Sequence, residues 1–232
     1  MRSFMLRGGR LTDGQKRGLD EFWPRFGIDT DESLLDFKTL FGNDAPVIME
    51  IGFGNGDATW KMAQACPAEN YLGVEVHLPG VGHLLLKMNQ HGIANIRISN
   101  EDAVEFLRNR IPQESLDGVR IYFPDPWPKK RHHKRRLIQP TFIELLALRM
   151  CPGALLHLAT DWEPYAAHML EVIRSTDSFA NLSPSGDFCD QPEWRPKTKY
   201  ERRGDRLGHQ VRDLIFKKIP PPNGVGAVLA LG

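Results

Sequence analysis

Short apolar runs alternate with stretches of helical periodicity from Pro46 to Ser175, and this alternation constrains the fold more than any other feature. The expected strands span 47–51, 71–76, 95–99, 118–123 and 154–159, and the expected helices span 58–65, 82–90, 101–110, 141–150 and 165–175. Strands and helices at this spacing are typical of βαβ units, which build a mainly parallel sheet. We therefore predict an α/β fold with a mostly parallel central sheet and helices on both of its faces.

The segments outside this alternation have different patterns. Residues 1–44 are weakly periodic, so we expect an N-terminal arm with a helix near 31–40, followed by a single domain over 45–219. Within that domain the stretch 210–217 alternates imperfectly, which predicts an antiparallel edge strand. The tail 220–232 begins with three prolines and has no periodicity, so we expect it to be disordered.

The composition argues against several classes of protein. Cys66, Cys151 and Cys189 lie far apart and form no CxxC pair, which disfavours a disulfide framework or a cysteine-based zinc site. The apolar runs are too short to span a bilayer, and residues 1–10 contain no apolar block of signal-peptide length. We expect a cytoplasmic protein without a membrane segment.

Positive charge gathers in two places although the net charge is only +1. Residues 129–136 contain six lysines or arginines and two histidines, and residues 195–206 contain six more cations. Local basic patches are the usual electrostatic footprint of nucleic-acid binding, although a run of charge is more often only a solvated face. The two histidines are adjacent and lack the spacing of metal ligands, so we expect no metal.

A glycine-rich segment follows the first expected strand and reads Glu50-Ile51-Gly52-Phe53-Gly54-Asn55-Gly56-Asp57. Glycines at alternate positions permit a tight turn and a close backbone approach to a ligand. The dinucleotide-binding fingerprint places its third glycine one residue later, and a carboxylate beside the loop would repel a pyrophosphate. A ligand with a sulfonium and an ammonium group fits this acidic loop better, and a turn with no ligand is the plainer alternative.

Two more acids follow the next two expected strands. Glu75 stands about 20 residues beyond the glycines, where a carboxylate can accept hydrogen bonds from ribose hydroxyls. Asp102 could accept from an adenine amino group, or it could cap the helix that follows, whose first turn favours anions. Because the carboxyl ends of parallel strands meet at one edge, these acids and Glu50 are expected to face one crevice. The arrangement resembles the Rossmann-like class I S-adenosylmethionine-dependent methyltransferases.

A proline-rich segment, Pro124-Asp125-Pro126-Trp127-Pro128, follows the fourth expected strand. The prolines keep the backbone extended and prevent it from continuing a sheet or a helix. Asp125 is therefore expected at the carboxyl end of a central strand. Trp127 could stack on a base, and it could equally be a packing anchor.

The whole segment PDPWPKKRHHKRR at 124–136 resembles the bacterial single-chain tRNA (guanine-N7-)-methyltransferase family. The likeness runs from about Arg2 to Lys217, and it includes Arg2-Ser3-Phe4 with Gly9-Arg10, the 50–56 loop, Ala159-Thr160-Asp161 and Thr198-Lys199-Tyr200-Glu201. The PDPW segment with its basic tail is highly specific, whereas the glycine loop alone indicates only the superfamily. The tail beyond Pro220 matches no feature of the family.

The resemblance implies methyl transfer from S-adenosylmethionine to nitrogen 7 of a variable-loop guanine in tRNA, without a metal. It implies a donor site made of Glu50, Gly52, Gly54, Gly56, Glu75, Asp102 and Asp125, in which Asp125 is also catalytic. It assigns substrate contacts to Lys129, Asp161, Thr198, Lys199, Tyr200 and Glu201, and tRNA contacts to Arg131, His132, His133, Lys134, Arg135 and Arg136. It implies no obligate protein partner, and we expect a monomer or a homodimer.

Three alternatives to this function remain open from the sequence. The first is a methyltransferase for another substrate, which could be another RNA, a protein side chain or a small molecule. The last two substrates would use the glycine loop but leave the basic patches idle. A nicotinamide-dependent oxidoreductase is disfavoured by the glycine spacing. A non-catalytic RNA-binding protein on the same fold is disfavoured by the acids at all four strand ends.

Glu201 is the first candidate to recognise the guanine. One carboxylate can accept both from the ring N–H and from the exocyclic amine of guanine, whereas adenine presents a ring acceptor at that edge. Asp161 is the rival for this role. In the plainer alternative, Glu201 is an ion-pair partner of Lys199, Arg202 or Arg203.

Overall fold

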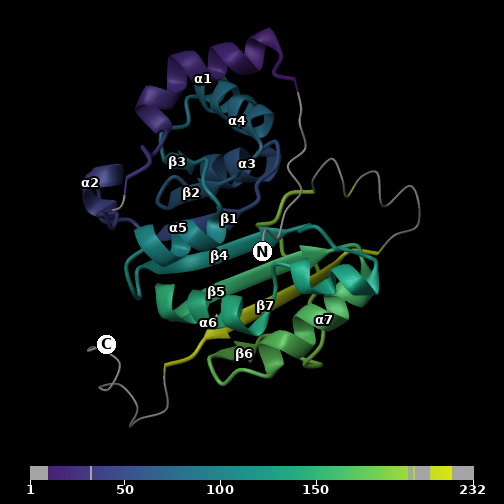
Figure 1. The fold of residues 1–232 in the computed structure, drawn as a ribbon. Helices are drawn as coiled ribbons and strands as arrows, with labels where there is room; N and C mark the ends of the chain where they lie inside the picture. Colours follow the sequence, from purple (N-terminus) through teal and green to yellow (C-terminus); the bar gives the residue numbers. More distant parts are fainter. Residues whose placement is uncertain (1–9, 32, 198–200, 202–209, 221–232) are drawn as a thin grey trace.

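The computed structural model describes residues 10–31, 33–197, 201 and 210–220 (Figure 1). Its elements are α1 (Asp13–Phe26), α2 (Phe37–Phe41), β1 (Val47–Ile51), α3 (Asp57–Ala65), β2 (Asn70–Val74), α4 (Leu78–His91), β3 (Ile96–Ser99), α5 (Ala103–Arg110), β4 (Leu116–Tyr122), η1 (Lys130–Arg135), α6 (Pro140–Arg149), β5 (Met150–Thr160), α7 (Glu163–Arg174), β6 (Phe179–Asn181) and β7 (Arg212–Lys218). Every strand and helix expected between residues 47 and 175 is present, with ends that differ by a few residues. None of the described helices is long and apolar enough to cross a membrane.

The described strands form one seven-stranded sheet in the order β3-β2-β1-β4-β5-β7-β6. The first five strands of the chain pair in parallel, and β7 runs antiparallel to both β5 and β6. A mostly parallel sheet with an antiparallel strand near one edge is therefore confirmed. The outermost strand is β6, which was not predicted because three residues are too few to show a periodicity.

Side chains alternate along each strand and point into two separate cores. Val47, Met49 and Ile51 of β1 pack in the core that contains α5, α6 and α7, whereas Ile48 packs in the core that contains α3 and α4. Figure 1 shows the two helix layers on opposite sides of the sheet. Glu50 neighbours Ile48 in this alternation and therefore points to the side of α3.

The residues before β1 differ from the expectation. The helix expected near 31–40 is wrong over most of its length, because the Asp31 carboxylate accepts bonds from the Ser33 amide and hydroxyl and closes a turn there. The main helix is α1, which starts with a capping box: Thr12 Oγ1 accepts from the Gln15 amide, and Gln15 Oε1 accepts from the Thr12 amide. Two glycines and a proline inside α1 weaken its periodic signal.

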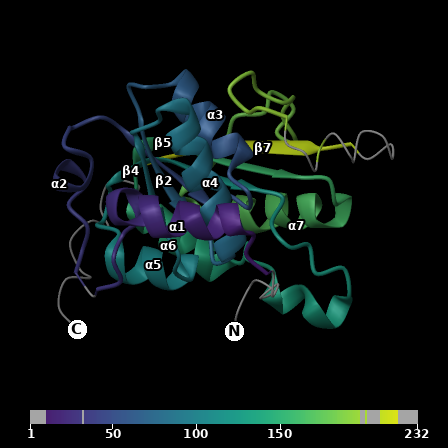
Figure 2. The same ribbon diagram turned by 90° about the horizontal axis from the view of Figure 1, so that it is seen from above.

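Helix α1 lies across α4, as the view from above shows (Figure 2). A Cβ atom on Gly18 would lie 2.7 Å from the carbonyl oxygen of Gly82, and one on Gly82 would lie 2.5 Å from the carbonyl oxygen of Gln15. The two helices thus touch backbone to backbone, which requires glycine on both sides. This contact brings Gln15 to the wall of the cavity described next.

Candidate active site

A cavity of about 560 Å³ opens at the carboxyl ends of β1, β2 and β4. Its wall includes the candidate site residues Glu50, Gly52, Gly54, Glu75, Asp125 and Asp161. Open parallel sheets bind ligands beyond the carboxyl ends of their strands, so the cavity lies where the fold predicts a site. Gly56 and Asp102, which were also expected there, are absent from this wall.

The glycine loop turns sharply between β1 and α3. Gly52, Gly54 and Gly56 have φ angles of 71°, 61° and 74°, a left-handed region that favours glycine. A Cβ atom on Gly52 or Gly54 would meet nothing within 4 Å, so the backbone there borders open space that a ligand can enter. A Cβ on Gly56 would lie 2.8 Å from the Leu84 side chain. Gly56 therefore serves the packing against Leu84, and its contact with the donor stays a prediction.

Glu75 holds the tip of this loop. One carboxylate oxygen accepts from the Gly54 amide at 2.8 Å, and the other accepts from the His77 amide at 2.9 Å. Burial raises the pKa of Glu75, and the two backbone amides partly oppose this shift. The carboxylate is thus fixed in direction at the edge of the cavity.

Glu50 is 3% exposed, and its Oε2 accepts from the Thr59 hydroxyl at 2.8 Å. Burial raises the pKa of Glu50 to about 7, while the Thr59 bond and the charge of Arg120 oppose the shift. A buried carboxyl in this state is stabilised in its ionised form by a cation. The site therefore suits a positively charged ligand.

Asp102 adopts the capping role that was weighed against ligand binding. Its Oδ1 accepts from the amides of Val104 and Glu105 at 2.9 and 3.2 Å, at the start of α5. Its neighbours Glu101 and Ala103 line the cavity. Glu101 and Ala103, rather than Asp102 itself, therefore belong to this part of the wall.

Asp125 lies between two residues with unusual backbone conformations. Phe123 and Trp127 have φ angles of 52° and 44°, although neither is glycine, and each such residue costs roughly 1–3 kcal/mol. The Phe123 amide donates to the carbonyl oxygen of Ala159 at 2.7 Å, which anchors one end of the turn. Trp127 is 8% exposed and packs beneath Arg135 and His132. These contacts favour Trp127 as a packing anchor.

One glycine and one histidine of α4 line the cavity and were not predicted from the sequence. A Cβ on Gly80 would lie 1.9 Å from the carbonyl oxygen of Gly54, so α4 can press on the glycine loop only with glycine there. His83 Nδ1 donates to the carbonyl oxygen of Asn55 at 2.7 Å. The only local sequence signal was a glycine in the first turn of a helix, where it weakens the helix and needs another reason.

Comparison with known proteins decides the family. Residues 44–214 match a family model described as "Putative methyltransferase". The chain is 53% identical over 224 residues to the tRNA (guanine-N(7)-)-methyltransferase of Halorhodospira halophila, over 96% of this chain and 97% of that protein. It is 51% identical to the protein of that name from Alcanivorax borkumensis, over 94% and 91% of the two chains. This chain belongs to the tRNA (guanine-N(7)-)-methyltransferase family.

Solved structures of low sequence identity share the fold. The 16S rRNA methyltransferase KamB has a TM-score of 0.57 at 16% identity, over 84% of this chain and 99% of that one. A variant 16S rRNA (adenine(1408)-N(1))-methyltransferase from Catenulisporales acidiphilia has a TM-score of 0.57 at 17% identity, over 84% and 96%. The Rossmann-like class I methyltransferase fold expected from the sequence is therefore confirmed.

The basic run of this methyltransferase family member forms the 3-10 helix η1 beside the Asp125 turn. Lys129, Arg131, Lys134 and Arg135 are exposed, and His132 and His133 are half-buried. Arg136 differs from the expectation of a tRNA contact, because it is only 3% exposed. Its Nε donates to the carbonyl oxygen of Pro126 at 3.0 Å, and its guanidinium lies 4.8 Å from the Tyr165 ring centroid. Arg136 therefore stabilises the turn that contains Asp125 from its buried side.

The substrate residues implied by the family resemblance differ in their exposure and in their distance from the cavity wall. Asp161 follows β5, is exposed and lines the cavity. Glu201 is 3% exposed, and both of its oxygens accept from Arg195, which was not foreseen as its partner. Thr198, Lys199 and Tyr200 lie outside the described residues. Among the described residues, no group of three or more His, Cys, Asp or Glu side chains is placed to hold a metal.

Proposed function

We propose that this protein transfers the methyl group of S-adenosylmethionine to nitrogen 7 of a guanine in the variable loop of tRNA. The observation that carries the proposal is the identity of about half of all residues, over nearly the full length, to proteins named tRNA (guanine-N(7)-)-methyltransferase. The geometry supports it, because an acidic cavity opens beside an exposed basic helix. The methyl donor and a polyanionic substrate can therefore be held side by side.

The cavity fits the donor in both shape and charge. Open backbone at Gly52 and Gly54 permits the close approach of a ligand, and Glu50 favours a cationic group because of its burial. Glu75 is held by two backbone amides and keeps lone pairs that can accept from ribose hydroxyls. When it is bound, S-adenosylmethionine supplies an electrophilic methyl group on a positively charged sulfur.

Asp125 is the proposed catalytic residue. Nitrogen 7 of guanine has an in-plane lone pair and no proton, so the attack on the methyl group needs no general base. Catalysis then depends on alignment and on electrostatic stabilisation. Positive charge develops on the guanine ring during transfer, and we propose that the carboxylate of Asp125, a residue of the cavity wall, stabilises it.

The exposed cations of η1 are proposed to hold the tRNA backbone. Lysine and arginine contacts to phosphates position an RNA without reading its sequence. They also offset the cost of pulling the guanine out of its tertiary contacts, which is a few kcal/mol. The exposed side chains available for this role are Lys130, Arg131, Lys134 and Arg135 of η1, together with Lys129 just before it.

Asp161 is the proposed reader of the guanine, in place of Glu201. Both oxygens of Glu201 already bind the Arg195 guanidinium in a buried position, which leaves that carboxylate poorly placed to receive a base. Asp161 is exposed and lines the cavity. A carboxylate that accepts from the two donors of the guanine edge discriminates against adenine by about 1–3 kcal/mol.

The function is tested by tritium transfer from S-adenosylmethionine into unmodified bulk tRNA, followed by nucleoside analysis. We expect tritium only in 7-methylguanosine. Label in another nucleoside would indicate a different RNA methyltransferase. Donor binding with no label in tRNA would favour either another substrate or a non-catalytic RNA-binding protein.

A further inference from the structure

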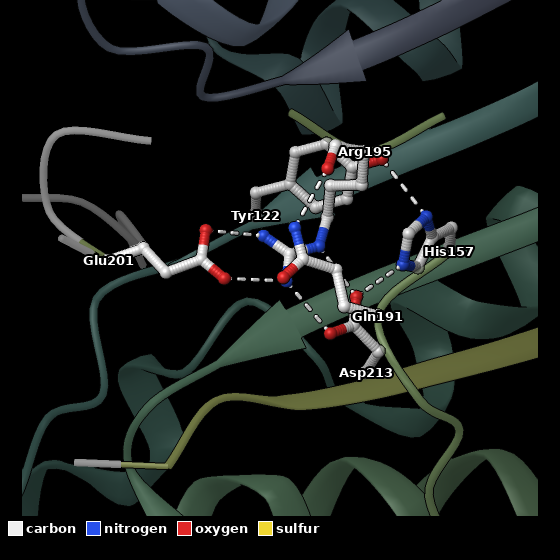
Figure 3. Close-up of polar contacts among 6 residues, drawn as sticks. All are labelled: Tyr122, His157, Gln191, Arg195, Glu201 and Asp213. Atoms are coloured by element: carbon white, nitrogen blue, oxygen red, sulfur yellow. Dashed lines mark hydrogen bonds and ion pairs between the residues drawn. The ribbon is translucent and has the colours of Figure 1, made fainter. Parts of the chain in front are cut away.

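A continuous network of buried polar side chains joins the end of β4 to β7 (Figure 3), with the Arg195 guanidinium at its centre. Its Nη1 and Nη2 donate to the two oxygens of Glu201 at 2.8 and 2.9 Å. Its Nε and Nη2 donate to the two oxygens of Asp213 at 2.7 and 2.9 Å. Arg195 and Asp213 are each 1% exposed. One guanidinium therefore binds two carboxylates from different segments, that of Glu201 and that of Asp213 in β7.

The network continues from Asp213 towards the active site through a histidine. His157 Nε2 lies 2.7 Å from Asp213 Oδ1, and His157 Nδ1 lies 3.0 Å from the Tyr122 hydroxyl. Burial lowers the pKa of His157, so the ring is neutral at neutral pH. Because the carboxylate only accepts, Nε2–H donates to Asp213, and Nδ1 accepts from the Tyr122 O–H. The direction of each hydrogen bond is thereby set.

Only an arginine can occupy the centre of this network. Its planar fork presents several donors in fixed directions, whereas a lysine has one compact ammonium group. A buried ion cluster of this kind adds little net stability compared with apolar packing. Its effect is to hold its partners in one arrangement.

The partners of Arg195 belong to the segments that lead to Asp125 and Asp161, two of the acids in the cavity wall. Tyr122 is the last residue of β4 and stands three positions before Asp125. Asp213 pairs in register with Ala159, which accepts from the Phe123 amide and stands two positions before Asp161. The Arg195 guanidinium also lies 5.8 and 5.9 Å from the ring centroids of Tyr122 and Phe123. The clamp lies directly behind the two turns that bear Asp125 and Asp161.

We propose that Arg195 is a positioning residue for methyl transfer, which ties Glu201 to Asp213 and, through His157 and Tyr122, holds the Asp125 turn in its reactive position. This inference rests on the proposed function and assigns Glu201 to positioning rather than to base recognition. A displacement of about 1 Å at a reacting group can cost on the order of 100-fold in rate. Loss of the clamp should therefore appear in the chemical step.

The first test compares Arg195→Met and Arg195→Lys with the wild type in single-turnover methyl transfer at saturating donor and tRNA. We expect Arg195→Met to lower the rate on the order of 100-fold, with S-adenosylmethionine affinity unchanged within about threefold. Arg195→Lys should lower the rate almost as much as Arg195→Met. It keeps the positive charge but lacks the planar guanidinium with its several donors in fixed directions. Tyr122→Phe removes only the phenolic hydroxyl at the end of the network and keeps the packing of the ring. It should lower the single-turnover rate by a smaller factor.

A double-mutant cycle separates the two roles considered for Glu201. If Glu201 acts through Arg195, Glu201→Gln and Arg195→Met lower the rate by similar factors, and the double variant is no worse than either one. If Glu201 reads the base independently, the two factors multiply in the double variant. That result would overturn the assignment of Glu201 to positioning.

A readout independent of catalysis is the hydrogen exchange of the Phe123 amide, which donates to Ala159. We expect faster exchange in Arg195→Met without donor or tRNA. Arg149→Met is the matched control, because Arg149 donates to the carbonyl oxygens of Leu107 and Arg108, away from the described cavity wall. It should leave Phe123 exchange and the single-turnover rate unchanged.

Two results would overturn the proposal for Arg195. One is a wild-type single-turnover rate in Arg195→Met; the other is a rate that returns to the wild-type value once cooling restores the fully folded variant. Methyl transfer by the wild-type chain is measured in the same series. A wild type that forms no 7-methylguanosine contradicts the proposed function, and the exchange of Phe123 then still reports on the clamp.

Discussion

At the scale of single residues, the chemistry of the site depends on two carboxyl groups in different surroundings. Glu50 is enclosed and has a pKa near 7, whereas Asp125 stands in a strained turn at the cavity wall. The first acid responds to a cation that arrives with the donor. The second responds to the positive charge that develops on the substrate. The two acids can therefore be separated by experiment.

We predict that the affinity for S-adenosylmethionine depends on pH through Glu50. The donor is cationic and stabilises the carboxylate, so binding at low pH must release a proton. The affinity should rise by up to about tenfold per pH unit as pH approaches 7 from below, and it should level off above 7. Calorimetry in buffers of different ionisation enthalpy measures the released proton. Glu50→Gln should remove both effects, and an unchanged pH profile in this variant would contradict the assignment.

The folding stability of the free protein has the opposite dependence on pH. The pKa of Glu50 is raised in the folded state, so its stabilising contribution is present below the unfolded pKa and is lost as pH rises through about 7. Glu50→Gln cannot ionise. As pH rises from the unfolded pKa of a glutamate to about 7, the free energy of unfolding of Glu50→Gln should therefore fall less than that of the wild type.

We predict that Asp125→Asn lowers the rate of methyl transfer far more than it weakens binding. A preorganised group that acts on the developing charge contributes on the order of 100-fold to the rate. Single-turnover kinetics should show this loss, while the Kd of tRNA changes little. Near-normal turnover in a folded Asp125→Asn variant would exclude Asp125 as the group that stabilises the charge.

At the scale of elements, close backbone contacts determine how the helices surround the cavity. Helix α1 touches α4 through Gly18 and Gly82, and α4 touches the glycine loop through Gly80. The N-terminal helix is thereby connected by direct packing to the loop beside Glu75. Residues that line none of the cavity can in this way affect its shape.

We predict opposite effects for two glycine substitutions in α1. Gly18→Ala places a Cβ 2.7 Å from the carbonyl oxygen of Gly82, and such overpacking typically costs about 1–3 kcal/mol of unfolding free energy. Gly14→Ala has only ordinary contacts, 3.8 Å from Leu86 and 4.0 Å from Thr12, and should stabilise by up to about 1 kcal/mol. Urea unfolding measures both variants. Equal stability of the two would mean that α1 is not docked on α4 in this way.

At the scale of the whole molecule, buried and half-buried charged groups are arranged in a row across one face of the sheet. Arg120 lies opposite Glu50 in the pairing of β1 and β4 and opposite His157 in the pairing of β4 and β5. Beyond His157 come Asp213 and Arg195 with Glu201. With Glu50 protonated, the two arginines balance the two carboxylates of Asp213 and Glu201. A cationic donor would in turn balance an ionised Glu50.

We predict that the exposed cations of η1 contribute to tRNA binding independently of these charged groups on the sheet. Removing the exposed cations Arg131 and Lys134 together, each to Ala, should raise the tRNA KM and flatten its salt dependence. Each lost phosphate contact lowers the log–log slope by about 0.7–0.9. Lys38→Ala with Arg108→Ala, which removes two exposed cations elsewhere, is the control. An unchanged slope in the first pair would make η1 only a solvated surface.

Local patterns in the sequence determined the order of strands and helices from β1 to α7 and the acids at the strand ends. A strand or helix leaves its own periodicity, and in a parallel sheet the ends of strands share one edge, so Glu50, Glu75 and Asp125 could be grouped without coordinates. The glycine loop was equally readable because Gly52 and Gly54 need positive φ angles whatever packs around them.

Only the tertiary structure decided the contacts between segments that are distant in the chain. The sequence showed Arg136 as one more cation of a run, yet Pro126 and Tyr165 bury it. It showed the carboxylate Glu201 next to several cations, yet in the fold Glu201 binds Arg195, which Asp213 also holds. Such pairings depend on which surfaces meet when the layers pack, and neither periodicity nor composition records them.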